Sequence, residues 1–266
     1  MLLLLTPFLS GCDAYYYHRG RFCEDTKRTL GAIRAYESFL ARDSGSPRTA
    51  EVSVRLAYLY AAQLDRCLEA RRLYESALRR FPHAEPWASR AKAGIMACPD
   101  YFPLDTGRSW VYGDTSSQGK NMTLDWQVRL SSGIRTEVFT ALYAGKKKIR
   151  EGTETYEKKD WAVWQRIGRD EAPILRYPFH PGSRWSARRA EGEISYLVES
   201  DDASVAVGAG VFERCLKVRA TNKRFPQSWK YDYYAPGVGR VKTTVGGPGI
   251  ENPNTELMKF DKMTAR

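Results

Sequence analysis

Apolar residues recur with a helical period over residues 24–97. The segment from Ala32 to Leu40 aligns with the segment from Ala70 to Leu78, 38 residues later. Self-similarity at such a period is typical of helical hairpins, which bury their apolar faces only by stacking on one another. The spacing predicts helices near residues 24–42, 48–64, 67–81 and 85–97.

Seven residues of the second hairpin occupy packing positions. Small residues let paired helices approach closely, aromatic residues fill the space between repeats, and a proline ends a helix because it lacks a backbone N–H. The residues in question are Leu56, Ala57, Tyr60, Ala70, Tyr74, Ala77 and Pro82. Together they resemble a tetratricopeptide repeat, which implies an array of helical hairpins over residues 23–99. A generic helical bundle is the alternative.

After Pro99 the helical period gives way to alternation. In residues 123–130, apolar side chains fall on one face and polar side chains on the other, which is the period of a half-buried strand. Similar runs cover residues 135–143, 161–167, 194–199, 211–220 and 228–234. We expect about nine to eleven antiparallel strands over residues 100–266, in an open barrel or curved sheet, with a turn at Asp201-Asp202.

A phrase repeats inside this half of the chain. Pro103, Gly107 and Trp110 have the same spacing as Pro178, Gly182 and Trp185, and each phrase precedes an alternating run. The echo predicts a duplicated β-unit, with chance as the alternative. With the segments 210–218 and 233–242, these phrases resemble a β-rich domain of bacterial envelope proteins that has no known activity. The fold class is therefore α+β, with the helical and β parts as separate domains.

The N-terminus carries an export pattern. An apolar run over residues 2–8 leads into Leu9-Ser10-Gly11-Cys12, which resembles the lipobox of bacterial lipoproteins. The resemblance implies a signal peptide over residues 1–11, acylation of Cys12 and a lipidated tether over residues 12–22. Eleven residues are too few to span a membrane, which takes roughly 20. Because leucines follow Met1 without a basic region, we expect the true start upstream.

The other four cysteines suit an oxidising envelope, which permits disulfides. If helices 67–81 and 85–97 are antiparallel, Cys67 and Cys98 meet at the open end of their hairpin and can form a disulfide. Pairing of Cys23 with Cys67 is the rival. The sequence contains no CxxC or HxxxH spacing, so we expect no metal site.

The net charge of +11 is spread along the chain, with one basic run at Lys146–Lys148. In an exported protein such a balance favours anionic lipid headgroups or other envelope polymers over nucleic acid, with a solvated basic surface of no specific use as the alternative. The sequence shows no Gly-x-Ser-x-Gly elbow and no phosphate-binding or dinucleotide fingerprint. We therefore expect neither an enzyme nor a cofactor.

Three functions remain for a lipid-anchored envelope protein that faces the periplasm or the exterior. The first is a scaffold whose helical repeats bind another envelope protein. The second is a carrier that holds a lipid or other apolar ligand in the β-domain, and the third is an unrecognised hydrolase. A filled sheet interior with an exposed concave helical groove favours the scaffold, whereas an apolar cavity above about 300 Å³ favours the carrier. Acid and base side chains close together in a cleft favour the hydrolase.

Overall fold

The computed structural model describes residues 10–42, 45–132 and 135–261 of the chain, with side chains described from residue 13 onward. The expected lipid attachment at the Cys12 side chain and residues 1–9 of the expected signal peptide lie outside this part. The chain divides into two compact units, Met1–Pro99 and Asp100–Arg266. Within the described residues, no helix is both long and apolar enough to cross a membrane.

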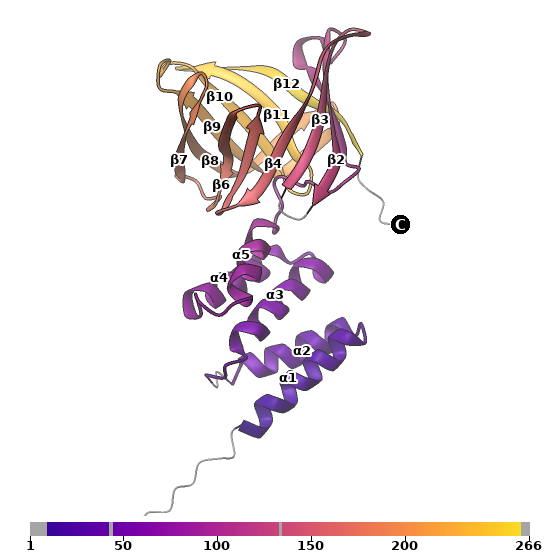
Figure 1. Ribbon diagram of the computed structural model, residues 1–266, viewed down its shortest axis with the longest axis vertical. Coiled ribbons are helices and arrows are strands. Elements are labelled where there is room, and N and C mark those ends of the chain that lie inside the picture. The colour runs from indigo at the N-terminus through magenta and orange to yellow at the C-terminus, as the bar shows by residue number, and fades with distance from the viewer. Residues whose placement is uncertain (1–9, 43–44, 133–134, 262–266) are drawn as a thin grey trace, which may run out of the picture. The chain divides into compact units, whose positions relative to one another are not determined.

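The first unit is a short array of paired helices, as the sequence predicts (Figure 1). The described helices are α1 (Ser10–Asp25), α2 (Thr29–Leu40), α3 (Thr49–Leu64), α4 (Cys67–Arg80) and α5 (Trp87–Met96). The expectation of a tether over residues 12–22 is wrong, because these residues are helical and belong to α1, which packs on α2.

Two tyrosines that are 38 residues apart pack in the same way. A Cβ atom added at Gly20 of α1 would lie 2.2 Å from Cε1 of Tyr36, and one added at Gly94 of α5 would lie 2.2 Å from Cζ of Tyr74. Tyr36 is fully buried, and its hydroxyl donates a 2.7 Å hydrogen bond to Glu24. Each glycine therefore gives a tyrosine ring room to lie against a neighbouring helix.

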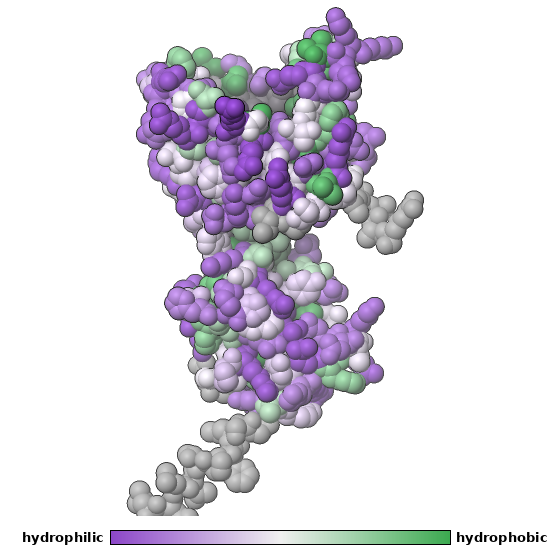
Figure 2. All heavy atoms as spheres, viewed as in Figure 1, coloured by the Kyte–Doolittle hydropathy of each residue, from purple (hydrophilic) through white to green (hydrophobic). Residues whose placement is uncertain are grey.

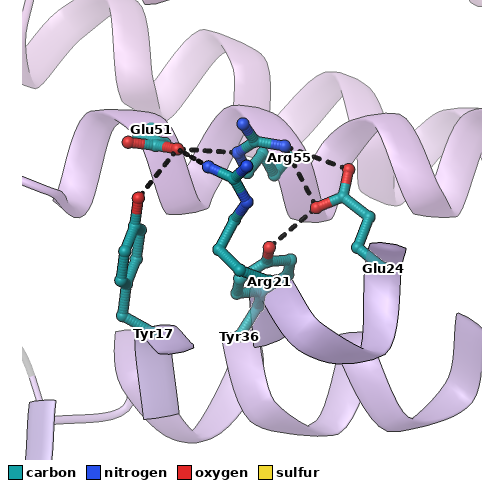
Figure 3. Close-up of polar contacts among 6 residues, drawn as sticks. All are labelled: Tyr17, Arg21, Glu24, Tyr36, Glu51 and Arg55. Atoms are coloured by element: carbon teal, nitrogen blue, oxygen red, sulfur yellow. Dashed lines mark hydrogen bonds and ion pairs between the residues drawn. The ribbon is translucent and has the colours of Figure 1, made fainter. Parts of the chain in front are cut away.

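A polar cluster holds α1 against α3 (Figure 3). Tyr17 and Arg21 of α1 donate hydrogen bonds of 3.2 and 3.3 Å to Glu51 of α3. Arg55 donates to Glu51 at 2.8 Å and to Glu24 of α1 at 3.1 Å. The partners are about 30 residues apart in sequence, so a local apolar period could not reveal this attachment of α1.

The second unit is a nearly closed antiparallel barrel, which confirms the predicted fold class (Figure 1). Its described residues form twelve strands, more than the nine to eleven expected. The strands are β1 (Ser109–Asp114), β2 (Met122–Ser132), β3 (Arg135–Ala144), β4 (Lys147–Lys159), β5 (Ala162–Ile167), β6 (Asp170–Arg176), β7 (Arg184–Arg189), β8 (Gly192–Val207), β9 (Gly210–Asn222), β10 (Trp229–Ala235), β11 (Gly239–Gly247) and β12 (Ile250–Asp261). Consecutive strands pair antiparallel and β1 pairs with β12, which leaves a seam between β6 and β7.

The expected turn at Asp201-Asp202 is wrong. Strand β8 runs through both aspartates, and its pairing with β9 shifts register near them, between Ser200 and Ala203. An irregular pairing accommodates these two acidic residues without ending the strand.

The repeated phrase does mark two structurally matching segments. The N–H of Gly107 donates to the carbonyl of Val128 at 3.0 Å, and the N–H of Gly182 donates to that of Val198 at 2.8 Å. Trp110 and Trp185 are buried, and each indole N–H donates to a backbone carbonyl. Each phrase opens a run of six consecutive strands, β1–β6 and β7–β12, so the barrel consists of two six-stranded meanders.

Candidate functional site

The interior of the barrel is closed at the end where β1 begins. Phe102 is 5% exposed, and its ring centroid lies 5.0 Å from that of Tyr156, 6.2 Å from that of Tyr234 and 6.3 Å from that of Trp126. This aromatic cluster comes from β2, β4 and β10 together with the segment that precedes β1. It forms a floor across the interior.

A cavity of about 690 Å³ lies above this floor. Its walls include apolar and aromatic side chains of both meanders, among them Ile174, Ile194, Tyr196, Val218 and Trp229. The interior of the sheet is therefore not filled.

The cavity reaches the opposite end of the barrel. Because consecutive strands are antiparallel, the turns after β5, β7, β9 and β11 share this end. Its lining includes Ile167, Phe225 and Val245, which are 47%, 65% and 42% exposed. Figure 2 shows hydrophobic residues interrupting the hydrophilic surface along the upper rim of the β-unit. The mouth of the cavity thus carries solvent-exposed apolar side chains.

Side chains bridge the seam between β6 and β7, where the backbone ladder is interrupted. Arg189 of β7 forms a 3.1 Å ion pair with Asp170 of β6 and donates a 2.9 Å hydrogen bond to Gln165 of β5. The indole N–H of Trp185 donates to the carbonyl of Pro173 in β6 at 3.2 Å. These contacts close the wall of the cavity.

A buried acid of the cavity is held by a lysine and a threonine. The Asp232 carboxylate, 7% exposed, lies 2.7 Å from the Lys230 ammonium and accepts a 2.7 Å hydrogen bond from the Thr243 hydroxyl. Burial would raise the pKa of Asp232, but the charges of Lys230 and Arg240 together with these two hydrogen bonds hold it below its ordinary value. Asp232 is therefore a carboxylate inside the barrel.

Arg240 of β11 lines the deep part of the same cavity. Its guanidinium carbon lies 5.0 Å from the ring centroids of both Tyr112 and Trp126. Within the described residues, no side chain forms an ion pair with it, and its buried Nε has no hydrogen-bond partner. A guanidinium has five N–H donors, which ring faces do not satisfy as carboxylate or carbonyl oxygens do.

A β-bulge turns Arg240 inward. Tyr234 pairs with Arg240 and Tyr233 pairs with Lys242, so Val241 is an extra residue between the two pairs. Thr243 lies opposite Asp232, and its side chain points into the barrel, where it contacts the Asp232 carboxylate. If side chains alternated strictly from Thr243, residue 241 would point inward and residue 240 outward. Bulges of this kind re-aim a side chain next to functional sites.

The structure also places the residues that the sequence singled out. Cys67 and Cys98 form a disulfide with Cα atoms 5.1 Å apart, the pairing that the hairpin geometry favours. Cys23, the rival partner, is a buried free thiol. Six of the seven predicted packing residues are buried, namely Leu56, Ala57, Tyr60, Ala70, Tyr74 and Ala77. The seventh, Pro82, is exposed and follows the C-cap of α4.

Sequence reasoning missed the cavity and its arginine. Arg240 stands between Gly239 and Val241, inside a phrase that carried the resemblance to an envelope β-domain. Its inward direction depends on the bulge, which no alternation pattern marks. The signal that was available is a charged residue inside a segment of mainly apolar and small residues.

Comparison with known proteins adds similarities of fold. No family model matches the chain, and no curated protein matches it. A solved structure of a candidate exported protein with a YmcC-like fold from Bacteroides fragilis is 17% identical, with a TM-score of 0.42, and the match covers 62% of this chain and 100% of that one. A candidate lipoprotein from Parabacteroides distasonis is 15% identical, with a TM-score of 0.40, over 60% of this chain and 98% of that one.

Proposed function

We propose that the protein binds a small ligand with an apolar body inside the β-unit, as a carrier or binder in the bacterial envelope. The observation that carries this proposal is the cavity of about 690 Å³. Ligand sites have volumes of about 300–1,000 Å³ and are lined mainly by apolar and aromatic side chains with a few polar groups. Barrels of about eight strands can fill their interior with side chains, whereas larger barrels enclose ligand cavities or channels.

The cavity changes the order of the three functions considered above. A filled sheet interior was one of the two features that favoured a protein-interaction scaffold, beside an exposed concave helical groove, and the interior contains a cavity. The expected partner of the helical repeats, another envelope protein, stays a prediction. The helical unit offers such a partner an apolar surface. Its large apolar side chains that are more than half exposed are Tyr15, Phe22, Leu30, Tyr58 and Leu68.

Hydrolysis has less support than binding. Two of the three acids that line the cavity are paired, Asp170 with Arg189 and Asp232 with Lys230, and the third, Glu191, is exposed in a turn. A general base needs a side chain that is free to accept a proton within reach of a nucleophile. The cavity lining contains neither histidine nor cysteine, and we propose a non-enzymatic role.

Attachment to the membrane follows from the lipobox-like Leu9-Ser10-Gly11-Cys12. The two structures of similar fold, described as a candidate exported protein and a candidate lipoprotein, are consistent with an envelope location. When the gene is expressed in a bacterial host, a fatty-acid analogue should label the protein. The variant Cys12→Ser should lose the label, because the thiol that carries the acyl group is absent. Label retained in this variant would refute the anchor.

The ligand itself can be sought in protein taken from its own envelope. The lipid-anchored chain is extracted in mild detergent, exchanged into detergent-free nanodiscs and analysed by native mass spectrometry. We expect an extra mass of one small molecule per chain that is lost when the protein is unfolded. A chain that shows only the mass of the acylated polypeptide, in extracts where added apolar probes also fail to bind, would contradict the proposal.

A further inference from the structure

We infer that the ligand is a single-chain amphiphile with an anionic head, and that it enters head first so that the head reaches Arg240 on the cavity floor. This inference rests on the proposed function and names its ligand class. It is drawn from the pairing of charges inside the barrel, from the surroundings of Arg240 and from the apolar mouth of the cavity.

Most charged side chains that line the cavity form ion pairs with one another, and one basic side chain deep in the cavity does not. Asp170 and Arg189 form one ion pair, and Asp232 and Lys230 form another. The remaining acid, Glu191, is exposed and lies in the turn between β7 and β8, at the mouth. The remaining base is Arg240, next to the floor. Asp232 attracts Arg240 electrostatically, but its carboxylate is in direct contact with Lys230, so no carboxylate of the described residues touches the Arg240 guanidinium. A cation inside a protein without such a contact is costly, and an anionic ligand would supply it.

Within the described residues, the buried Nε of Arg240 has no hydrogen-bond acceptor. The rings of Tyr112 and Trp126 lie 5.0 Å from the guanidinium carbon, while Asp232 on the neighbouring strand is already held by Lys230 and Thr243. A guanidinium binds carboxylate or phosphate oxygens with two parallel hydrogen bonds, and the aromatic surroundings strengthen that interaction by excluding water. An anionic group of the ligand would supply the missing acceptors.

The direction of the ligand follows from the two ends of the cavity. The anion site lies at the closed end, and the exposed apolar residues Ile167, Phe225 and Val245 lie at the open end. The walls between them are mainly aromatic and aliphatic. A molecule that fits both ends carries one anionic group on an apolar chain, and the chain extends toward the mouth.

The test varies the head on a twelve-carbon chain and includes the carboxylate head without that chain. Isothermal titration of the full-length protein, stripped of bound ligand, is carried out with dodecanoate, with dodecanol and with acetate. Dodecanoate should bind at least about tenfold more tightly than dodecanol, because a charge-assisted pair contributes at least about 1.4 kcal/mol. Acetate, which has the head without the chain, should bind too weakly to measure. Dodecyl phosphate distinguishes a phosphate from a carboxylate head, and tight binding of either anion supports the inference.

Two matched variants assign the effect to the arginine. Arg240→Met should remove the preference for dodecanoate over dodecanol, whereas Lys242→Met, the same change on the other face of β11, should preserve it. Arg240→Lys should keep part of the preference, which excludes a general loss of folding. Thermal melting without ligand adds a second readout: Arg240→Met should still melt as a folded protein, because Asp232 keeps its ion pair with Lys230 and its hydrogen bond from Thr243.

The outcomes separate the two proposals. Equal binding of dodecanoate and dodecanol in wild type and in Arg240→Met would overturn the anionic-head inference and leave the carrier function standing. Failure of every chain-bearing probe to bind the wild-type protein would overturn both.

Discussion

Removal of the Cys67–Cys98 disulfide should lower the free energy of unfolding of the helical unit by about 3–4 kcal/mol, in the chain-entropy model for the 31 residues that it spans. The disulfide joins the start of α4 to the segment after α5, so it restrains the last hairpin of an array of only five described helices. Short repeat arrays have few interfaces between neighbours, and each one that is lost matters more.

Denaturant titration of the double variant Cys67→Ser/Cys98→Ser measures this effect. Far-UV circular dichroism at 222 nm follows the helices, and tryptophan fluorescence mainly follows the β-unit, which has six of the seven tryptophans. The helical transition should move to lower denaturant, and a reductant should shift the wild-type protein equally but leave the double variant unchanged. An unchanged helical transition would show that the crosslink does not stabilise this unit.

Local periodicity predicted those parts of the fold that local patterns control. The apolar period of residues 24–97 led to four of the five described helices, and alternation led to the antiparallel sheet. The apolar period did not predict helix α1, because this helix is held by polar and aromatic contacts. Arg55 and Glu51, which anchor it, lie on α3 about 30 residues away. A tether and a helix that depends on such distant partners are hard to distinguish from sequence.

The repeated Pro-x3-Gly-x2-Trp phrase shows the opposite case. Gly107 and Gly182 both adopt a positive φ, of 86° and 89°, a conformation that favours glycine. The hydrogen bonds that follow them match as well. The same backbone requirement is therefore met in both segments by the same residue types, and this is why the repeat can be recognised in the sequence.

The candidate site was largely beyond prediction from sequence. Whether a twelve-stranded barrel fills its interior depends on side chains from strands far apart in the chain, and alternation reports only which residues face inward. At Arg240 alternation fails as well, because the bulge at Val241 reverses the face. The prediction of a turn at Asp201-Asp202 failed for a similar reason, because strand β8 continues through these residues with a shifted register.

Ala220→Trp should weaken ligand binding by about 100-fold, which corresponds to about 2.7 kcal/mol. Ala220 lines the cavity on β9, where it pairs with Tyr196 of β8 and Lys230 of β10. An indole at this position would occupy space that the ligand needs. Ala206→Trp is the matched control, because Ala206 of β8 is exposed and does not line the cavity.

Fluorescence titration with a dansyl-labelled fatty acid tests the central claim, that the interior of the β-unit is a ligand site. The wild-type protein and Ala206→Trp should bind one probe per chain with similar affinity, and Ala220→Trp should bind about 100-fold more weakly while melting as a folded protein. Equal binding of the probe by all three proteins, or by none of them, would contradict the account.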